Sequence, residues 1–135
     1  WQHVLDCLSG YLWLGARLAD DDSLVDAFNF GPESEAQRPV IELVENFLQH
    51  WPGEWRDTSD ANAPQEAVTL SLAIDKARQQ LGWQPVWDFA TAVHRTARWY
   101  HQRHVVTVDD LHGLSLAQLE AFTSDAIRQE IVWAK

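Results

Sequence analysis

The amino-acid sequence predicts a helix-rich α/β domain with two or three short strands. Apolar residues recur at helical spacing along most of the chain, and shorter segments have the composition or the period-two alternation of strands. A chain of 135 residues is the size of one domain and can bury a sizeable core. The arrangement is too small for a complete doubly wound nucleotide-binding sheet, so we expect a single domain over residues 1–135.

The first quarter of the chain is expected to hold an extended segment, a helix and a strand. Residues 1–6 read as a short extended segment. The helix that follows carries its apolar residues at helical spacing, at Leu8, Leu12, Gly15 and Leu18. Residues 27–30 read as a short buried strand, which Gly31-Pro32 closes with a turn.

A second helix and a long loop are expected next. Pro39 suits the first position of a helix whose continuous apolar stripe runs to Trp51. Pro52-Gly53 ends this helix. Residues 54–64 are rich in Asp, Asn, Ser, Ala and Pro, which is typical of a loop.

Start and stop signals surround a third helix that begins at Asp75. The alternation of apolar and polar residues over 68–72 predicts a half-buried strand just before it. Asp75 can cap the helix, Gly82 can take the left-handed conformation that ends it, and Pro85 prevents its continuation.

Two more helices are expected in the last third. Asp88 can cap a helix whose apolar face runs to Tyr100. Ser115 and Gln118 have the spacing of a capping box, so a final helix is predicted from there to about Val132.

Charge and composition narrow the classes of partner. The net charge of −10 repels polyphosphate backbones, so nucleic acid is not expected as a partner. A single pyrophosphate needs only one or two placed Arg residues, which net charge does not exclude. One Cys cannot form an internal disulfide, and no apolar run reaches about 18 residues. We expect a soluble cytoplasmic domain with no membrane contact.

Several catalytic motifs are missing from the sequence. There is no glycine-rich dinucleotide turn and no P-loop. The Tyr-x-x-x-Lys pair of short-chain dehydrogenases cannot be drawn, because Gly15 follows Tyr11 at that spacing and His104 follows Tyr100. His101 and His104 read as a solvated helix end rather than as metal ligands. We therefore expect no catalytic residue and no metal site in this chain.

Five stretches together resemble the C-terminal, substrate-side domain of CDP-glucose 4,6-dehydratases, which are extended short-chain dehydrogenase/reductases. The stretches are Trp-Gln-His-Val-Leu-Asp at 1–6, Ala-Phe-Asn-Phe-Gly-Pro at 27–32, Gln-Glu-Ala at 65–67, Leu-Gly-Trp-Gln-Pro at 81–85 and Thr-Ala-Arg-Trp-Tyr at 96–100. The resemblance runs from Trp1 to about Tyr100. Three positions depart from the family pattern: Cys7 replaces a Pro, Gln65 a His and Ala73 an Asp.

The resemblance implies that this chain is the substrate-binding part of a larger enzyme. A Rossmann domain upstream of residue 1 would hold NAD and the catalytic residues and would pack against this part, and the complete enzyme would be a homo-oligomer. The family oxidises C4 of the glucosyl ring, eliminates water across C5 and C6 and returns the hydride to C6. The product, CDP-4-keto-6-deoxyglucose, serves the synthesis of deoxysugars for the O-antigen of bacterial lipopolysaccharide.

The resemblance also implies which residues face the nucleotide sugar. Trp1, His3, Gln65 and Glu66 lie at the ends of segments that match family motifs, and we predict them as substrate-binding residues. Packing against the missing domain is the alternative for Trp1 and His3, and a solvated loop edge is the alternative for Gln65 and Glu66. Two other functions stay open: a non-catalytic interaction or structural module, and a fragment of a related nucleotide-sugar epimerase or reductase.

Overall fold

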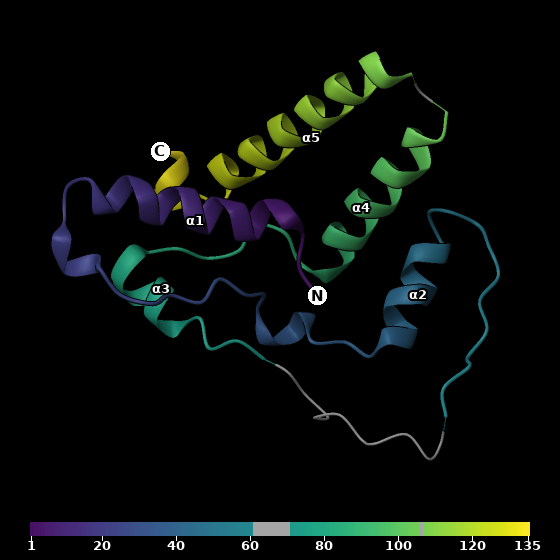
Figure 1. Ribbon diagram of the computed structural model, residues 1–135, viewed down its shortest axis with the longest axis horizontal. Coiled ribbons are helices and arrows are strands. Elements are labelled where there is room, and N and C mark those ends of the chain that lie inside the picture. Colours follow the sequence, from purple (N-terminus) through teal and green to yellow (C-terminus); the bar gives the residue numbers. More distant parts are fainter. Residues whose placement is uncertain (61–70, 106) are drawn as a thin grey trace.

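The described part of the chain is helical. The computed structural model describes residues 1–60, 71–105 and 107–135. Within these ranges the chain forms α1 (Val4–Leu18), α2 (Val40–Leu48), α3 (Asp75–Leu81), α4 (Phe89–Arg103) and α5 (Val108–Arg128), with short 3₁₀ helices at Asp22–Leu24, Ser34–Ala36 and Val132–Ala134 (Figure 1). No strand occurs in these ranges, so the predicted α/β fold class was wrong.

Side chains take the place of the missing strand partners. Residues 27–30 have no regular secondary structure. The Gln2 side-chain amide donates to the carbonyl oxygen of Phe30 (3.2 Å), and the Asn29 amide donates to that of Ala73 (3.3 Å). Backbone acceptors that a second strand would have satisfied are satisfied by these amides. Of the other predicted strand, residues 68–70 lie outside the described residues, and residues 71–74 have no regular structure.

Helix α1 begins earlier than the sequence predicted. Residues 1–6 were expected to be extended, but the helix starts at Val4 because His3 caps it. The His3 Nδ1 atom accepts a hydrogen bond from the backbone N–H of Leu5 (3.2 Å). Histidine is not among the residues usually read as helix caps, so this start was missed.

The end of α3 follows its sequence signals. Gly82 is in the left-handed conformation (φ 64°), and the N–H of Trp83 donates to the carbonyl oxygen of Ala77 (3.2 Å), six residues earlier. These two features make a Schellman motif, as the glycine predicted. The start differs in detail, because Ile74 and not Asp75 is the capping residue and makes no side-chain cap.

The core lies on both sides of α1. On the α3 side, Leu81 and Trp83 pack with Phe30, and Trp83 is fully buried. On the α5 side, Trp87 packs with Phe122 of α5 and with other buried residues, namely Val86, Ala126 and Ile131. Figure 1 shows α1 running between α3 and the C-terminal end of α5.

Helices α4 and α5 form a hairpin. Asp88 caps α4 as predicted, its carboxylate accepting from the N–H of Thr91 (2.8 Å). Helix α5 starts at Val108, because Thr107 and Asp110 make a capping box. The predicted start at Ser115 was therefore wrong: Ser115 lies within the helix, and its hydroxyl donates to the Leu111 carbonyl oxygen (3.0 Å). Two capping patterns follow each other in the sequence, and the first is the one used.

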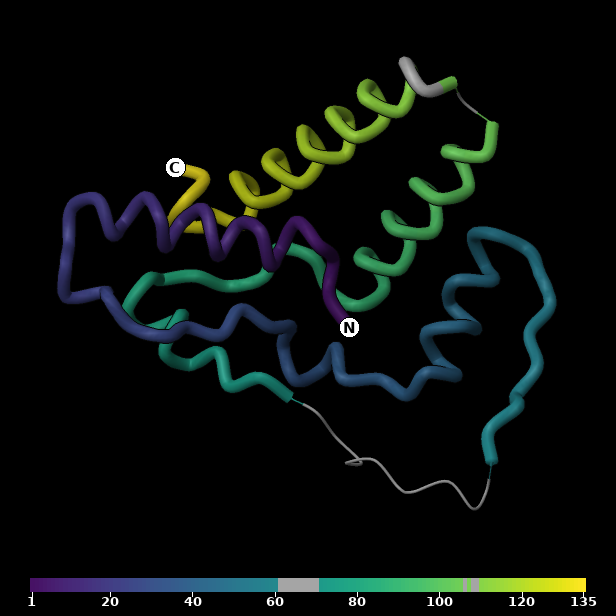
Figure 2. Tube along the Cα trace, in the orientation of Figure 1, coloured from purple at the N-terminus to yellow at the C-terminus, as the bar shows by residue number. Residues whose placement is uncertain are grey.

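Helix α2 packs on α4 without burying any of its own residues completely. It lies at the far side of the molecule from α3 (Figure 2). The predicted stripe to Trp51 extends past the helix, which ends at Leu48. The Trp51 ring instead lies near the rings of His101, in α4, and His104, which follows α4.

Candidate functional site

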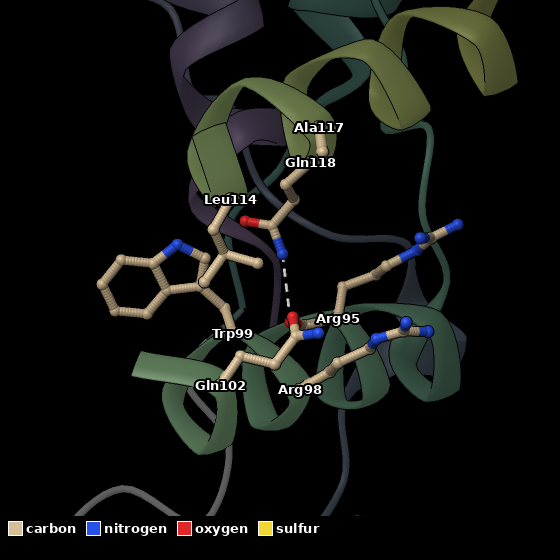
Figure 3. A pocket seen from close by; sticks show the side chains of 7 residues that line it. All are labelled: Arg95, Arg98, Trp99, Gln102, Leu114, Ala117 and Gln118. Carbon is tan, nitrogen blue, oxygen red and sulfur yellow. Dashed lines mark hydrogen bonds between the residues drawn. The ribbon is translucent and has the colours of Figure 1, made fainter. Parts of the chain in front are cut away.

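Two adjoining cavities lie between α4 and α5, and we call them together the α4–α5 cleft. The larger, of about 510 Å³, also reaches the first residues of α1; it is lined by Gln2, His3, Val4, Leu5, Thr96, Trp99, Tyr100, Ser115 and Gln118. The smaller, of about 220 Å³, is lined by Arg95, Arg98, Trp99, Gln102, Leu114, Ala117 and Gln118 (Figure 3). Trp99 and Gln118 border both cavities. The larger cavity has the volume of a typical small-molecule site.

The walls of the cleft are joined by side-chain hydrogen bonds. The Gln118 side-chain amide of α5 donates to the carbonyl oxygen of Arg95 in α4 (3.0 Å), a bond drawn in Figure 3. The Trp99 indole N–H donates to the hydroxyl of Ser115 (3.3 Å). Ala92, Val93 and Ala97 of the same helix are buried. Thr96, Trp99 and Tyr100 line the cleft.

His3 forms the inner wall of the larger cavity. It is buried, and its ring meets the Trp87 ring edge-on at 4.7 Å between centroids. Burial, with a smaller effect from the charge of Arg95, lowers the pKa of His3 to about 4. The imidazole is therefore neutral at neutral pH, with Nδ1 accepting from the backbone of α1. At this position His3 can shape a site but does not carry a positive charge.

A buried carboxylate fixes α1 against the segment before α4. Asp6 is fully buried, and one of its oxygens accepts from the N–H of Val86 (2.6 Å). Its second oxygen has no hydrogen-bond partner among the described residues. Burial raises the pKa of Asp6 to about 6, although hydrogen bonds from the backbone of Val86 and Trp87 act in the opposite direction. The carboxyl group thus joins α1 to the segment before α4 and does not line the cleft.

Gln2 presents an unused acceptor at the cleft. Its amide nitrogen is bonded to Phe30, but its Oε1 is buried without a partner in the described chain. Gln2 lines the larger cavity and also an apolar cavity of about 390 Å³ between α2 and α4. A ligand hydroxyl or amino group entering the cleft could donate to this oxygen.

The predicted site residues are only partly brought together. His3 lines the α4–α5 cleft, whereas Trp1 lines the apolar cavity beside α2, and Gln2 joins the two. Trp1 is half exposed, and its indole N–H donates to the Arg38 carbonyl oxygen (2.8 Å). Gln65 and Glu66 lie outside the described residues.

The cleft residues that the sequence did not predict as ligand contacts include Gln2, Arg95, Arg98, Trp99, Gln102 and Gln118. One signal could have found the arginines. In a chain of net charge −10, α4 contains three Arg and no Asp or Glu. Gln118 could not have been found, because the sequence pattern assigned it to a helix start.

No glycine-rich dinucleotide turn occurs among the described residues. A dinucleotide turn needs a glycine-rich loop between a strand and the first turn of a helix. The α-helices begin instead after His3, Pro39, Ile74, Asp88 and Thr107. No group of three or more metal-ligating side chains occurs within residues 1–60, 71–105 and 107–135. No described helix is both long and apolar enough to cross a bilayer.

Comparison with known proteins relates this chain to part of a dehydratase. No model of a protein family matches it. It is 35% identical over 102 residues to the CDP-glucose 4,6-dehydratase of Salmonella typhimurium. The matched region is 74% of this chain but only 28% of that enzyme. The chain thus spans little more than a quarter of its relative's length, and the similarity relates it to a portion of such an enzyme.

Proposed function

We propose that the chain is the C-terminal, nucleotide-sugar-binding part of an NAD-dependent CDP-glucose 4,6-dehydratase. The observation that carries the proposal is the 35% identity over most of this chain to an enzyme of that name. In this proposal the NAD site and the catalytic residues belong to the portion of the relative that this chain does not match. The chain alone is expected to bind substrate and to form no 4-keto product.

The α4–α5 cleft is the proposed substrate site. It combines the parts that a nucleotide sugar requires: the indole of Trp99 for a base or sugar face, the free Oε1 of Gln2 for a donor, and the guanidinium of Arg98 for a phosphate. His3 and Trp1 keep their proposed places near the ligand. Gln65 and Glu66 remain proposed contacts on the strength of the motif alone.

Calorimetric titration of the chain with CDP-glucose tests this proposal. We expect a Kd on the order of 0.1–1 mM, because part of the ligand's contacts would come from the other portion of the enzyme. GDP-mannose, with a different base and sugar, should bind more weakly. Trp99→Ala should weaken CDP-glucose about tenfold, the loss expected for one stacked ring.

Trp55→Ala is the matched control. Trp55 is half exposed and lines neither cavity of the cleft, so its replacement should leave the Kd unchanged. Equal affinity for both nucleotide sugars would favour a less selective relative, such as an epimerase or reductase. Absence of binding to either would favour a non-catalytic module.

A further inference from the structure

Helix α4 is a positively charged element on a negatively charged chain. It contains Arg95, Arg98 and Arg103 together with His94 and His101, and no acidic residue. The chain as a whole has 20 acidic and 10 basic residues. The charge of α4 is therefore opposite in sign to that of the chain as a whole.

Arg98 has no carboxylate partner in the described chain. The ion pairs there involve Arg38, Lys76, Arg78, Arg95 and Arg128. The charge of Arg98 is felt by His94, whose pKa is lowered by burial first and by the charges of His50, Arg95 and Arg98 after it. Arg98 is exposed, so its guanidinium is accessible to an anion.

Arg95 supports the same site from one turn earlier. Its guanidinium lies over the Trp87 ring at 5.2 Å, and its Nη2 is 3.8 Å from Asp125. Its Nε is buried and has no acceptor among the described residues. The negative charge of Asp125 repels an anion near Arg95 only weakly, because this carboxylate also pairs with Arg128 and accepts a hydrogen bond from the Trp87 indole (2.8 Å).

The smaller cavity of the cleft places these groups around an open space. In Figure 3 the two Arg side chains extend from α4 to one side, the Trp99 indole lies at the other, and the amides of Gln102 and Gln118 stand between them. The volume of this cavity, about 220 Å³, is several times the roughly 30 Å³ that one water molecule occupies in the liquid. A phosphate group with part of its water shell fits this volume.

We propose that Arg98 is the phosphate-binding residue of the α4–α5 cleft and takes the diphosphate of a nucleotide whose base or sugar lies against Trp99. Arg95 assists through its unused Nε, and the amides of Gln102 and Gln118 supply further donors. Arg suits this role because its planar group donates two parallel hydrogen bonds to one phosphate. The assignment rests on the proposed function for the identity of the nucleotide, but not for the anion site itself.

The test compares Arg98→Gln with Arg103→Gln, using CDP, cytidine and inorganic pyrophosphate as ligands. Arg103 is the matched control, because it is on the same helix, is exposed and lines neither cavity of the cleft. Loss of one charge-assisted hydrogen bond should weaken CDP and pyrophosphate by about tenfold or more in Arg98→Gln. Cytidine, which has no phosphate, should bind both variants and the parent equally.

Each outcome decides between the two proposals. If pyrophosphate binding depends on Arg98 and CDP-glucose does not bind, the anion site stands and the proposed function fails. If CDP binds Arg98→Gln as tightly as the parent, the anion site is overturned and the function stands. Equal weakening by Arg103→Gln would show diffuse attraction to α4 and would also overturn the site, as would absence of pyrophosphate and CDP binding to the parent.

Discussion

The surroundings of Trp83 and the α4–α5 cleft are built in opposite ways. Trp83 is fully buried, its indole N–H donates to the Ser9 hydroxyl (3.1 Å), and its ring meets that of Phe30 edge-on at 5.0 Å. Trp99 is partly exposed, borders two cavities and holds one hydrogen bond of 3.3 Å to a serine on the surface. Trp83 follows the end of α3 and packs in the core, whereas Trp99 lies within α4 and lines a cavity.

The difference separates residues that stabilise the fold from residues that are free to bind. Both tryptophans belong to stretches that resemble the dehydratase family, so the motif alone does not distinguish them. Their packing distinguishes them, because a side chain enclosed on all sides has no surface left for a ligand. Substitutions around Trp83 should therefore change stability, and substitutions in the cleft should change binding.

Trp83→Ala should have the largest effect on stability. Removing a fully buried indole leaves a cavity bordered by Phe30 and Leu81 and removes the hydrogen bond that the Ser9 hydroxyl accepts, at a cost of about 3–5 kcal/mol in the free energy of unfolding. Urea unfolding followed by circular dichroism measures the loss. Trp55→Ala, in an exposed loop, should stay within about 0.5 kcal/mol of the parent. An unchanged urea midpoint for Trp83→Ala would contradict the assignment of this residue to the core.

Two glycines of α1 provide a smaller and more specific contrast. A Cβ at Gly10 would overlap the ring of Phe30, which Trp83 holds in place, so Gly10→Ala should destabilise by about 1–3 kcal/mol. A Cβ at Gly15 meets nothing within 4 Å, so Gly15→Ala should stabilise by about 0.5–1 kcal/mol through helix propensity. Thermal melts of both variants should move in opposite directions. Movement in the same direction would show that α1 does not press on Phe30.

The titration of Asp6 and His3 is expected to have the smallest net effect on the stability of the parent protein. Between pH 3.8 and about 6 the folded chain holds the Asp6 proton more tightly than the unfolded chain, so this group lowers stability as the pH rises. Between about pH 4 and 6.5 the unfolded chain holds the His3 proton more tightly, so this group raises stability as the pH rises. Over pH 4–6 the contributions of Asp6 and His3 to the pH dependence of the free energy of unfolding nearly cancel.

Asp6→Asn should expose the slope that His3 contributes. The variant keeps an acceptor for the N–H of Val86 and loses the charge, so its free energy of unfolding should rise by about 2–3 kcal/mol more than that of the parent from pH 4 to pH 6.5. Other carboxyl groups contribute equally to both proteins. Urea unfolding at several pH values gives the comparison, and parallel profiles for the two proteins would contradict it. In His3→Gln only the Asp6 contribution remains, so the free energy of unfolding should rise less from pH 4 to pH 6.5 than that of the parent.

The sequence predicted those elements whose signals are local. Gly82 ended α3 and Asp88 capped α4 as expected, because a left-handed glycine and an acidic cap act within one helical turn. The strand predictions were wrong because strand pairing depends on contacts distant in the sequence. The Phe30 carbonyl oxygen accepts from the Gln2 side chain, and the Ala73 carbonyl oxygen accepts from the Asn29 side chain, where a strand would have bonded to a neighbouring strand. The prediction of the α5 start was wrong because the sequence contains two capping patterns, and which of them is used depends on the tertiary structure.

The candidate site was harder to predict than the helices. Residues 2, 99 and 118 are far apart in sequence and meet only because α1, α4 and α5 converge. The buried Oε1 of Gln2 has no sequence signature at all. Family-like motifs led to Trp1 and His3, which border adjoining cavities. Arg98 lies in the family-like stretch 96–100 but was not predicted as a site residue.

The eight tryptophans offer the most direct test of nucleotide-sugar binding at the cleft. Each indole N–H gives its own signal in a ¹⁵N–¹H correlation spectrum, and Trp→Phe variants assign the signals of Trp83 and Trp99. On titration with CDP-glucose, the Trp99 signal should move with the ligand concentration, while the fully buried Trp83 signal stays in place. A spectrum in which Trp99 is unaffected, or in which Trp83 moves as far as Trp99, would contradict binding at this cleft.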